Sequence, residues 1–236
     1  MSTMGLMSYR NTDILAEKTR NLKLSAIRKE ETNIKIYTSN GYADDLVKMK
    51  ELELGIMIAT GRGNFHATKD YKEFDCALDN GGFGCARQGY PFQTKLFMDN
   101  IDRCFKLGIK LDFIVTPDIM AGGMKSFEYS LKHAEGELYS APRLAVVVQD
   151  GMKPRWILPD IEPFTHIFIG GSVDWKWNTA KEWVDFAHDN DKKCHIGQCG
   201  QLKYLELAKE YGADSVDSAS FVRHKSWHII EEFMGR

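Results

Sequence analysis

Short apolar runs recur along the chain from residue 34 onward, with polar segments between them. Within each run the apolar residues follow one another and do not alternate strictly with polar ones. Near-continuous apolar runs of this kind are typical of parallel strands that are covered on both faces. We predict eight strands, at residues 34–37, 55–59, 74–78, 111–115, 144–148, 166–169, 194–197 and 213–216.

The segments between the later strands carry apolar residues at helical spacing. Positions i, i+3, i+4 and i+7 recur on one face, which predicts amphipathic helices at residues 92–107, 126–139, 179–188 and 202–211. Gly108 and Gly212 follow two of these segments, where a C-cap glycine is expected. We find no clear helix between residues 59 and 74, so this early part is expected to be irregular.

Strand and helix alternate up to an eighth strand, which is the pattern of a (β/α)8 TIM barrel. The rival is an open doubly wound sheet, which usually carries a GxGxxG turn after its first strand. Here Gly61-Arg62-Gly63 follows the second strand, and His66 stands where the third glycine would be. We therefore predict a single α/β domain, a TIM-barrel catalytic domain at residues 34–236, preceded by an arm or helix at residues 1–33.

The composition is that of a globular protein and does not by itself indicate a binding partner. The chain has 236 residues, 43% of them hydrophobic and 27% charged, and no apolar run reaches the roughly 18 residues of a membrane span. The first ten residues lack the apolar core of a signal peptide, and an odd count of five cysteines suits a reducing compartment. We expect a cytoplasmic protein of a bacterium or phage-infected cell, with no membrane contact. The net charge of −2 does not indicate nucleic acid, although a local basic patch would still allow it.

Polar residues follow most of the predicted strands. Asp79, Asp118, Gln149 with Asp150, and Asp217 each come directly or closely after a strand, and Gly170-Gly171 follows the sixth. Aspartate and glycine are also common turn residues, which is the simpler explanation for any one loop. In a barrel, however, the residues after the strands meet at one end, where the chemistry of such folds takes place. The coincidence over several loops favours a site.

The side chains in these loops suit chemistry on a glycosidic bond. Two carboxylates in one cleft can divide the work, one attacking an anomeric carbon while the other moves a proton. A third carboxylate can accept from the N–H groups of a purine edge, and a neighbouring glutamine amide can donate to its carbonyl oxygen. Glycines allow the backbone to approach a flat ligand. The sequence therefore predicts an enzyme that handles a base and its N-glycosidic bond.

The order of these motifs resembles that of the tRNA-guanine transglycosylases, which are (β/α)8 barrels that exchange guanine for a 7-deazaguanine. The family motif DSGGFQ is similar to residues 79–84, with Asn80 and Gly84 as departures, and VQGG is similar to residues 148–151, with Asp150 as a departure. The motif GxDxFDC is similar to residues 212–218, with Ser218 in place of cysteine. Pro117-Asp118, residues 169–171 and Arg223 also fit, so the resemblance covers about residues 75–225.

The resemblance implies a role for each matching residue. Asp217 would be the nucleophile that forms a covalent intermediate at C1′, and Asp79 would be the general acid and base. The base edge would be held by Asp118, Gln149 and the backbone of Gly170 and Gly171. Phe83 would stack on the base beside Gly82.

Departures from the family bear on the substrate and the metal. The tRNA enzymes continue into a zinc-bearing subdomain with clustered cysteines, for which we find no counterpart after residue 227. We expect the barrel to lack this subdomain and to need no metal or cofactor. Cys194, His195 and Cys199 are the alternative zinc ligands, but buried or loop cysteines are the default interpretation.

Without that subdomain, DNA is favoured over tRNA as the polymer, as in compact phage-type relatives, with a free 7-deazaguanine such as preQ0 as the second substrate. The same site would also suit a DNA glycosylase in which water resolves the intermediate. A third hypothesis is a non-catalytic nucleic-acid-binding barrel or partner subunit, and a homodimer stays open. We expect nucleic acid to be contacted by Trp175, Lys176, Arg223 and Lys225.

Overall fold

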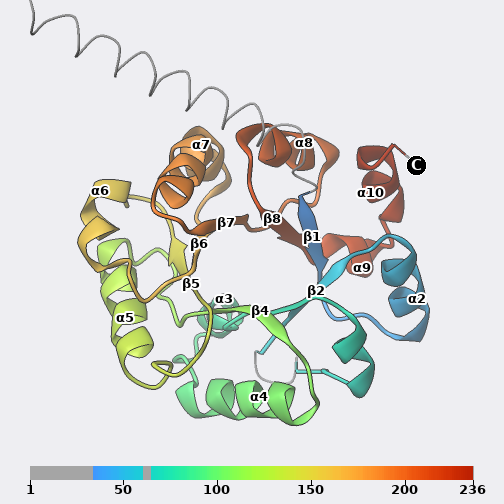
Figure 1. The fold of residues 1–236 in the computed structure, drawn as a ribbon, viewed down its shortest axis with the longest axis horizontal. Coiled ribbons are helices and arrows are strands. Elements are labelled where there is room, and N and C mark those ends of the chain that lie inside the picture. Colours follow the sequence, from blue (N-terminus) through green and yellow to red (C-terminus); the bar gives the residue numbers. More distant parts are fainter. Residues whose placement is uncertain (1–33, 61–64, 236) are drawn as a thin grey trace, which may run out of the picture. The chain divides into compact units, whose positions relative to one another are not determined.

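The computed structural model describes residues 34–60 and 65–235. The predicted arm or helix at residues 1–33 lies outside these ranges, as do Gly61, Arg62 and Gly63. Eight parallel strands close into a barrel in sequence order, which confirms the predicted (β/α)8 fold (Figure 1). The strands are β1 (Lys35–Thr38), β2 (Gly55–Ile58), β3 (Cys76–Leu78), β4 (Leu111–Val115), β5 (Leu144–Val148), β6 (His166–Ile169), β7 (Lys193–Ile196) and β8 (Ser215–Ser218).

The predicted helices correspond to α4 (Thr94–Lys106), α5 (Met124–Glu135), α7 (Val173–Asp189) and α8 (Leu202–Tyr211), which surround the strands (Figure 1). Helix α7 begins at Val173, well before the predicted start at residue 179. Gly212 caps α8 in the left-handed conformation, as predicted. Elements that the sequence analysis did not predict are α2 (Ala43–Glu51), α3 (Gly82–Arg87), α6 (Pro154–Ile157), α9 (Ser220–His224), α10 (Trp227–Phe233) and the 3₁₀ helices η1 (Lys69–Glu73) and η2 (Leu158–Asp160).

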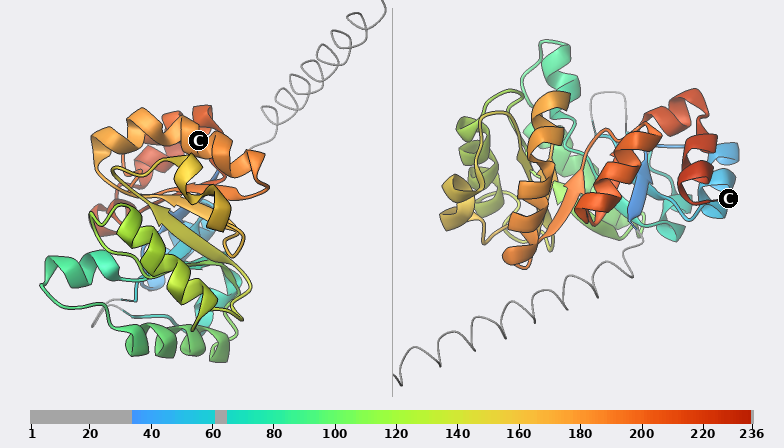
Figure 2. Two further views of the ribbon diagram at one scale, coloured as in Figure 1. Left: turned by 90° about the vertical axis from the view of Figure 1, so that its left-hand side faces the viewer. Right: turned by 90° about the horizontal axis from the view of Figure 1, so that it is seen from above.

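The early part of the barrel is irregular, as predicted. Among the described residues between β2 and β3, the 3₁₀ helix η1 is the one helical element. In both views of Figure 2 the short helix α3 stands away from the ring of helices, at one end of the barrel. Over the described ranges, every helix is too short or too polar to serve as a membrane span.

Alternation along the strands divides the apolar residues between two cores. The larger core lies between the strands and the helices and includes Trp183, Phe164 and Ile56, all fully buried. The smaller core fills the inside of the barrel, as expected for a packed barrel interior. It consists of Tyr37, Met57, Ala77, Phe113, Val115, Ala145 and Val147, with Phe168 packed against them.

The amino-terminal end of the barrel is closed by an ionic network. The Tyr37 hydroxyl donates to Asp112 at 2.5 Å, and the Lys35 ammonium contacts Asp112 at 3.1 Å and Asp75 at 2.7 Å. Burial and the neighbouring Asp112 carboxylate both raise the pKa of the Tyr37 hydroxyl. The network joins β1 to β4 across the barrel, at the end opposite to the predicted site.

Candidate active site

Asp217 lies within β8 and not after it. Strand β8 runs to Ser218 because it pairs with β1, with Asp217 opposite Tyr37. The prediction that the strand ends at residue 216 is therefore wrong. Alternation turns the Asp217 side chain into the barrel near its carboxyl-terminal end, where it is 18% exposed. One carboxylate oxygen, Oδ1, accepts hydrogen bonds from His195 Nε2 at 3.1 Å and from the Gln198 backbone N–H at 3.3 Å.

Asp79 directly follows β3 and lies within electrostatic reach of two other carboxylates. Burial is the largest cause that raises its pKa, and the charge of Asp217 is the next, followed by that of Asp118. Hydrogen bonds from the Gly81 and Asn80 backbone oppose this shift but do not cancel it, so the pKa stands at about 6. Carboxyl groups that hold their proton near neutral pH are suited to general acid and base work.

Asn80, one of the departures from the family motif, connects the loops after β3 and β4. Its side-chain amide donates to the Thr116 carbonyl at 2.6 Å and to Asp118 Oδ1 at 2.9 Å. Its own Oδ1 accepts from the Gly82 N–H at 2.6 Å. Burial raises the pKa of Asp118, although the hydrogen bond from Asn80 opposes the rise. Asn80 therefore fixes Asp118 beside the loop that carries Asp79.

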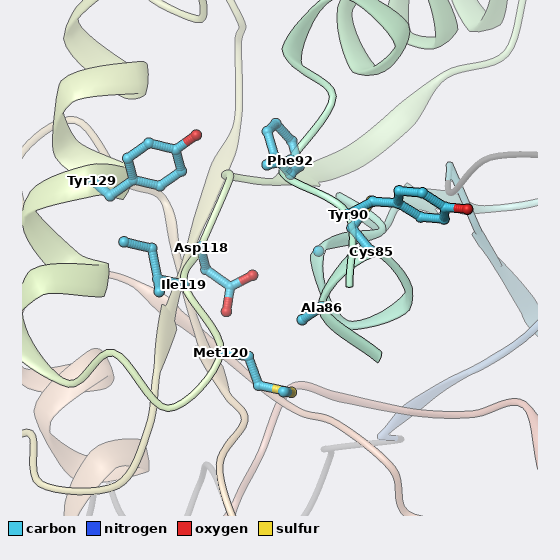
Figure 3. Close-up of a pocket in the computed structure, with 9 residues that line it drawn as sticks. Cys85, Ala86, Tyr90, Phe92, Asp118, Ile119, Met120 and Tyr129 are labelled. Carbon is cyan, nitrogen blue, oxygen red and sulfur yellow. The ribbon is translucent and has the colours of Figure 1, made fainter. Parts of the chain in front are cut away.

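A cavity of about 270 Å³ opens beside Asp118 (Figure 3). In Figure 3 the rings of Phe92 and Tyr129 lie above the Asp118 carboxylate, the ring of Tyr90 points away from it, and Met120 lies below it. These aromatic residues were not predicted as part of the site, although Tyr90-Pro91-Phe92 is an aromatic cluster shortly after the Asp79 motif. The cavity is lined by Gly82, Cys85, Ala86, Tyr90, Phe92, Asp118, Ile119, Met120 and Tyr129.

Phe83, which was expected to stack on a base, is not among the residues that line this cavity. It lies on α3, its side chain is 53% exposed, and its ring contacts the Arg87 guanidinium at 5.8 Å. The neighbouring Gly82 does line the cavity, and a Cβ at that position would come within 3.0 Å of Asp118 Oδ1. Glycine at position 82 thus leaves the Asp118 carboxylate accessible.

Gln149 is 4% exposed, and its amide donates to the Ile119 carbonyl at 2.9 Å. It therefore holds the loop that borders the cavity, and its N–H group is engaged within the protein. Recognition of a base edge by Gln149 stays a prediction.

Gly170 and Gly171 form the turn between β6 and α7. Gly171 has a φ of 75°, and a Cβ there would come within 2.5 Å of Asp150 Oδ2. Asp150 accepts from the Ser172 N–H at 2.7 Å and from the Ser172 hydroxyl at 2.5 Å. Asp150, whose role the sequence left open, thus caps the start of α7, and the glycine turn makes room for it.

The expected phosphate contact of Lys176 is contradicted by its position. Lys176 lies in the first turns of α7, is 2% exposed, and donates its ammonium to the Gly197 carbonyl. Burial lowers its pKa, against the effect of nearby Cys199 and Asp217. The adjacent Trp175 is partly buried and packs against the larger core, between the strands and the helices. Its ring lies 6.3 Å from that of Trp183. Lys176 and Trp175 both lie on α7, ahead of the predicted helix start at residue 179.

The two basic residues predicted after β8 lie at the surface. Arg223 is exposed on α9, and Lys225 directly follows that helix with a φ of 52°. The Lys225 ammonium forms an ion pair with Asp45 of α2, whose carboxylate is buried. The role of both residues in nucleic-acid binding stays a prediction, with the Lys225 charge already paired within the protein.

The alternative zinc ligands point in different directions, with Cys194 and His195 on β7 and Cys199 in the loop after it. Cys194 and Cys199 belong to the outer core, between strands and helices. His195 points into the barrel, where its ring lies 4.5 Å from that of Phe168 and 5.3 Å from that of Phe113. These three side chains therefore cannot converge on one ion. The sequence analysis did not assign His195 to Asp217, because this pairing depends on the register between β7 and β8.

The fold and the site define a (β/α)8 barrel with a cluster of three carboxylates, Asp79, Asp118 and Asp217, at the carboxyl-terminal end of its strands. A scan against protein-family models gives no match, and no curated protein matches the sequence significantly. The transglycosylase resemblance therefore rests on the motifs alone.

Proposed function

We propose that the chain is a base-exchange transglycosylase that replaces guanine in a nucleic acid, with DNA favoured over tRNA, by a free 7-deazaguanine. One observation carries this proposal. Asp79, Asp118 and Asp217 lie close together at the carboxyl-terminal end of the strands, and partial burial with the charges of Asp217 and Asp118 raises the pKa of Asp79 to about 6. Two carboxyl groups with different tendencies to hold a proton are what a double displacement at an anomeric carbon requires.

The first step would place the target nucleoside over Asp217. A carboxylate oxygen of Asp217 attacks C1′, the C1′–N9 bond breaks, and its electron pair leaves with guanine, which takes the proton from Asp79. In the second step ionised Asp79 accepts the N9 proton of the incoming base. N9 then attacks C1′, and the electron pair of the ester bond returns to Asp217. A target base within duplex DNA has to be flipped out of the stack first.

The cavity beside Asp118 supports a flat heterocycle as the ligand. Its volume of about 270 Å³ is small for a ligand pocket, which typically measures about 300–1,000 Å³, and suits a single ring system. The cavity is lined by aromatic residues, Tyr90, Phe92 and Tyr129, and by one carboxylate, and a carboxylate accepts the ring and exocyclic N–H groups of a guanine edge. We place the base edge on Asp118.

The test is incubation with guanine-containing DNA or RNA and radiolabelled guanine or preQ0. The expected result is label retained in DNA, and a covalent protein–DNA adduct on a denaturing gel when free base is withheld. Asp217→Asn should abolish both signals. Asp150→Asn is the matched control, because Asp150 is also a carboxylate at the mouth but is directed to Ser172.

The other hypotheses correspond to other outcomes of this experiment. Abasic sites without incorporated label would identify a DNA glycosylase, and label in RNA alone would exclude DNA as the substrate. If wild-type protein and Asp217→Asn bind DNA equally and neither labels nor depurinates a polymer, the enzyme proposal is refuted in favour of a binding protein or partner subunit.

A further inference from the structure

His195 lies directly beneath Asp217 inside the barrel. It is fully buried, and its two ring nitrogens have different partners: Nδ1 is 2.8 Å from Ser215 Oγ, and Nε2 is 3.1 Å from Asp217 Oδ1. Rings of Tyr37, Phe113 and Phe168 surround the imidazole at 5.9, 5.3 and 4.5 Å. An imidazole in such a cage has little freedom to turn.

The partners select one tautomer of the ring. A carboxylate oxygen only accepts hydrogen bonds, so Nε2 facing Asp217 must carry the proton. With a neutral ring, Nδ1 is then an acceptor, and the Ser215 hydroxyl can donate to it. Ser215 and Asp217 lie two residues apart on β8, so their side chains are on the same face of the strand. Each forms a hydrogen bond with one of the two ring nitrogens of His195.

The backbone after β7 reinforces this arrangement. Gln198 has a φ of 64°, an uncommon conformation for a residue other than glycine, and its N–H group is directed at the same oxygen of Asp217, at 3.3 Å. Strain of this kind persists where the surrounding structure fixes it and is enriched at functional sites. Both donors thus converge on Oδ1, and no described hydrogen bond occupies Oδ2.

We infer that His195 is the positioning residue for the Asp217 nucleophile, holding Oδ1 so that Oδ2 is the oxygen that attacks C1′. This inference rests on the proposed function. In the first step the Oδ2–C1′ bond forms as the electron pair of the C1′–N9 bond leaves with the base. In the second step the electron pair of the Oδ2–C1′ bond returns to the carboxylate, where the Nε2–H group still donates to Oδ1. His195 itself gains and loses no proton.

The kinetic test compares two replacements of His195. His195→Leu removes the donor, whereas His195→Gln keeps an N–H group that can reach the Nε2 position. We expect His195→Leu to lower kcat roughly 100-fold with little change in the KM for DNA, since misplaced reacting atoms cost about this factor. His195→Gln should recover much of that loss.

His166→Leu is the matched control, because His166 is another buried imidazole inside the barrel, packed 4.7 Å from the Phe113 ring and without a hydrogen bond to Asp217. This variant measures how much kcat falls when a buried imidazole that does not contact Asp217 is removed. Equal losses in His195→Leu and His166→Leu, or no recovery in His195→Gln, would show that His195 is merely structural.

A second measurement does not depend on activity. Long-range ¹H–¹⁵N NMR spectra of the wild-type protein should show His195 as the Nε2–H tautomer, with its signals identified by their loss in His195→Gln. Asp217→Asn should shift these signals and mix the tautomers, because an amide can donate as well as accept. Ser215→Ala should keep the Nε2–H tautomer, because Asp217 is still present, and Asp79→Asn should leave the signals in place. A Nδ1–H tautomer in wild type would overturn the inference.

The two failures can be told apart. If the wild-type protein forms no adduct with any polymer but the NMR pattern is as expected, the proposed function fails while the pairing of His195 and Asp217 stands. If adducts form and His195→Leu reacts like wild type, the positioning role fails while the function stands.

Discussion

At the scale of single residues, Asp79 links the electrostatics of the site to its chemistry. Its carboxyl group has a pKa of about 6 because burial and the Asp217 charge disfavour its ionised form. In the proposed mechanism Asp79 is the general acid, so it must be protonated when the first base departs. The group is mostly protonated below this pH and mostly ionised above it, so the surroundings of Asp79 set the pH range of the first step.

This gives a prediction for the rate of adduct formation. In single turnovers without free base, the rate should fall about tenfold for each pH unit above roughly 6, as the acid form of Asp79 is depleted. Adduct measured on denaturing gels over pH 5–8 would provide the profile. A rate that is flat across this range would assign the proton to another group.

The same pKa predicts a change in stability. The folded-state pKa of Asp79 lies above the ordinary value of 3.8, so its contribution to stability is complete below about pH 4 and is lost as pH rises through about 6. Asp79→Asn cannot ionise. It should therefore gain free energy of unfolding relative to wild type, on the order of 2 kcal/mol, between pH 4 and pH 8.

Urea unfolding of both proteins at these two pH values would check this prediction. Asparagine can lose a backbone hydrogen bond that the carboxylate accepted, and that loss is present at both pH values. The comparison therefore uses the change in the difference between the proteins. A difference that does not vary with pH would contradict the prediction.

At the scale of elements, the start of α7 depends on a carboxylate from another loop. Asp150 accepts two hydrogen bonds from Ser172, which is the N-cap residue of α7. Although burial acts to raise the pKa of Asp150, the hydrogen bonds from Ser172 outweigh it and keep the pKa below its ordinary value. A depressed pKa means that the stabilisation is present above about pH 4 and is lost as pH falls further.

Asp150→Ala should lower the free energy of unfolding by about 1 kcal/mol at pH 7, as expected for loss of a helix cap. The effect should shrink below pH 4, when Asp150 is protonated in the wild-type protein as well. Thermal or urea unfolding at pH 7 and pH 3 measures both values. An equal loss at both pH values would mean that packing, not the charge, is responsible.

The elements also show where sequence patterns are sufficient. Apolar runs predicted the eight strands because both faces of each strand are covered. The pattern failed at the end of β8, where Asp217 and Ser218 are polar because they belong to the mouth. It also failed for α2, whose apolar stripe is short, with Met49 fully buried and Val47 exposed. Polar strand ends are therefore where apolar periodicity is least informative.

Candidate site residues were predictable where a strand end fixes their position, and not where a side-chain contact depends on helix phase or strand register. Asp79 and Asp118 were found because their loops follow strands whose ends are fixed by the barrel. The orientation of Lys176 required the phase of a helix, and the contact between His195 and Asp217 required the register of two strands. Neither quantity can be read from the residues near Asp217 in the sequence.

At the scale of the whole molecule, the ionic network around Asp112 and the carboxylate cluster occupy opposite ends of the barrel. Asp112 binds Tyr37 and Lys35 at the amino-terminal end, while the carboxylate cluster lies at the other end. Asp112→Ala should lower the free energy of unfolding by about 2 kcal/mol, because a hydrogen bond to a charged group is lost and its partners stay in place.

The same variant should keep its KM and kcat within about twofold when assayed well below its unfolding midpoint, as expected for residues at the bottom face of a barrel. Denaturant unfolding and steady-state label incorporation test the two parts together. A large loss of kcat in a folded Asp112→Ala protein would show that the two ends are coupled.

Closure of the barrel by β1 and β8 also has a consequence for synthesis of the chain. Asp217 pairs with Tyr37 across this seam, so the first and last strands meet only after nearly the whole sequence has left the ribosome. Domains are made from the amino terminus at about 5–20 residues per second, and contacts between distant segments form late. A nascent chain would hold Asp79 and Asp118 for seconds before Asp217 joins them. Under the proposed function the last strand would act as a safeguard, because a truncated translation product would lack the Asp217 nucleophile.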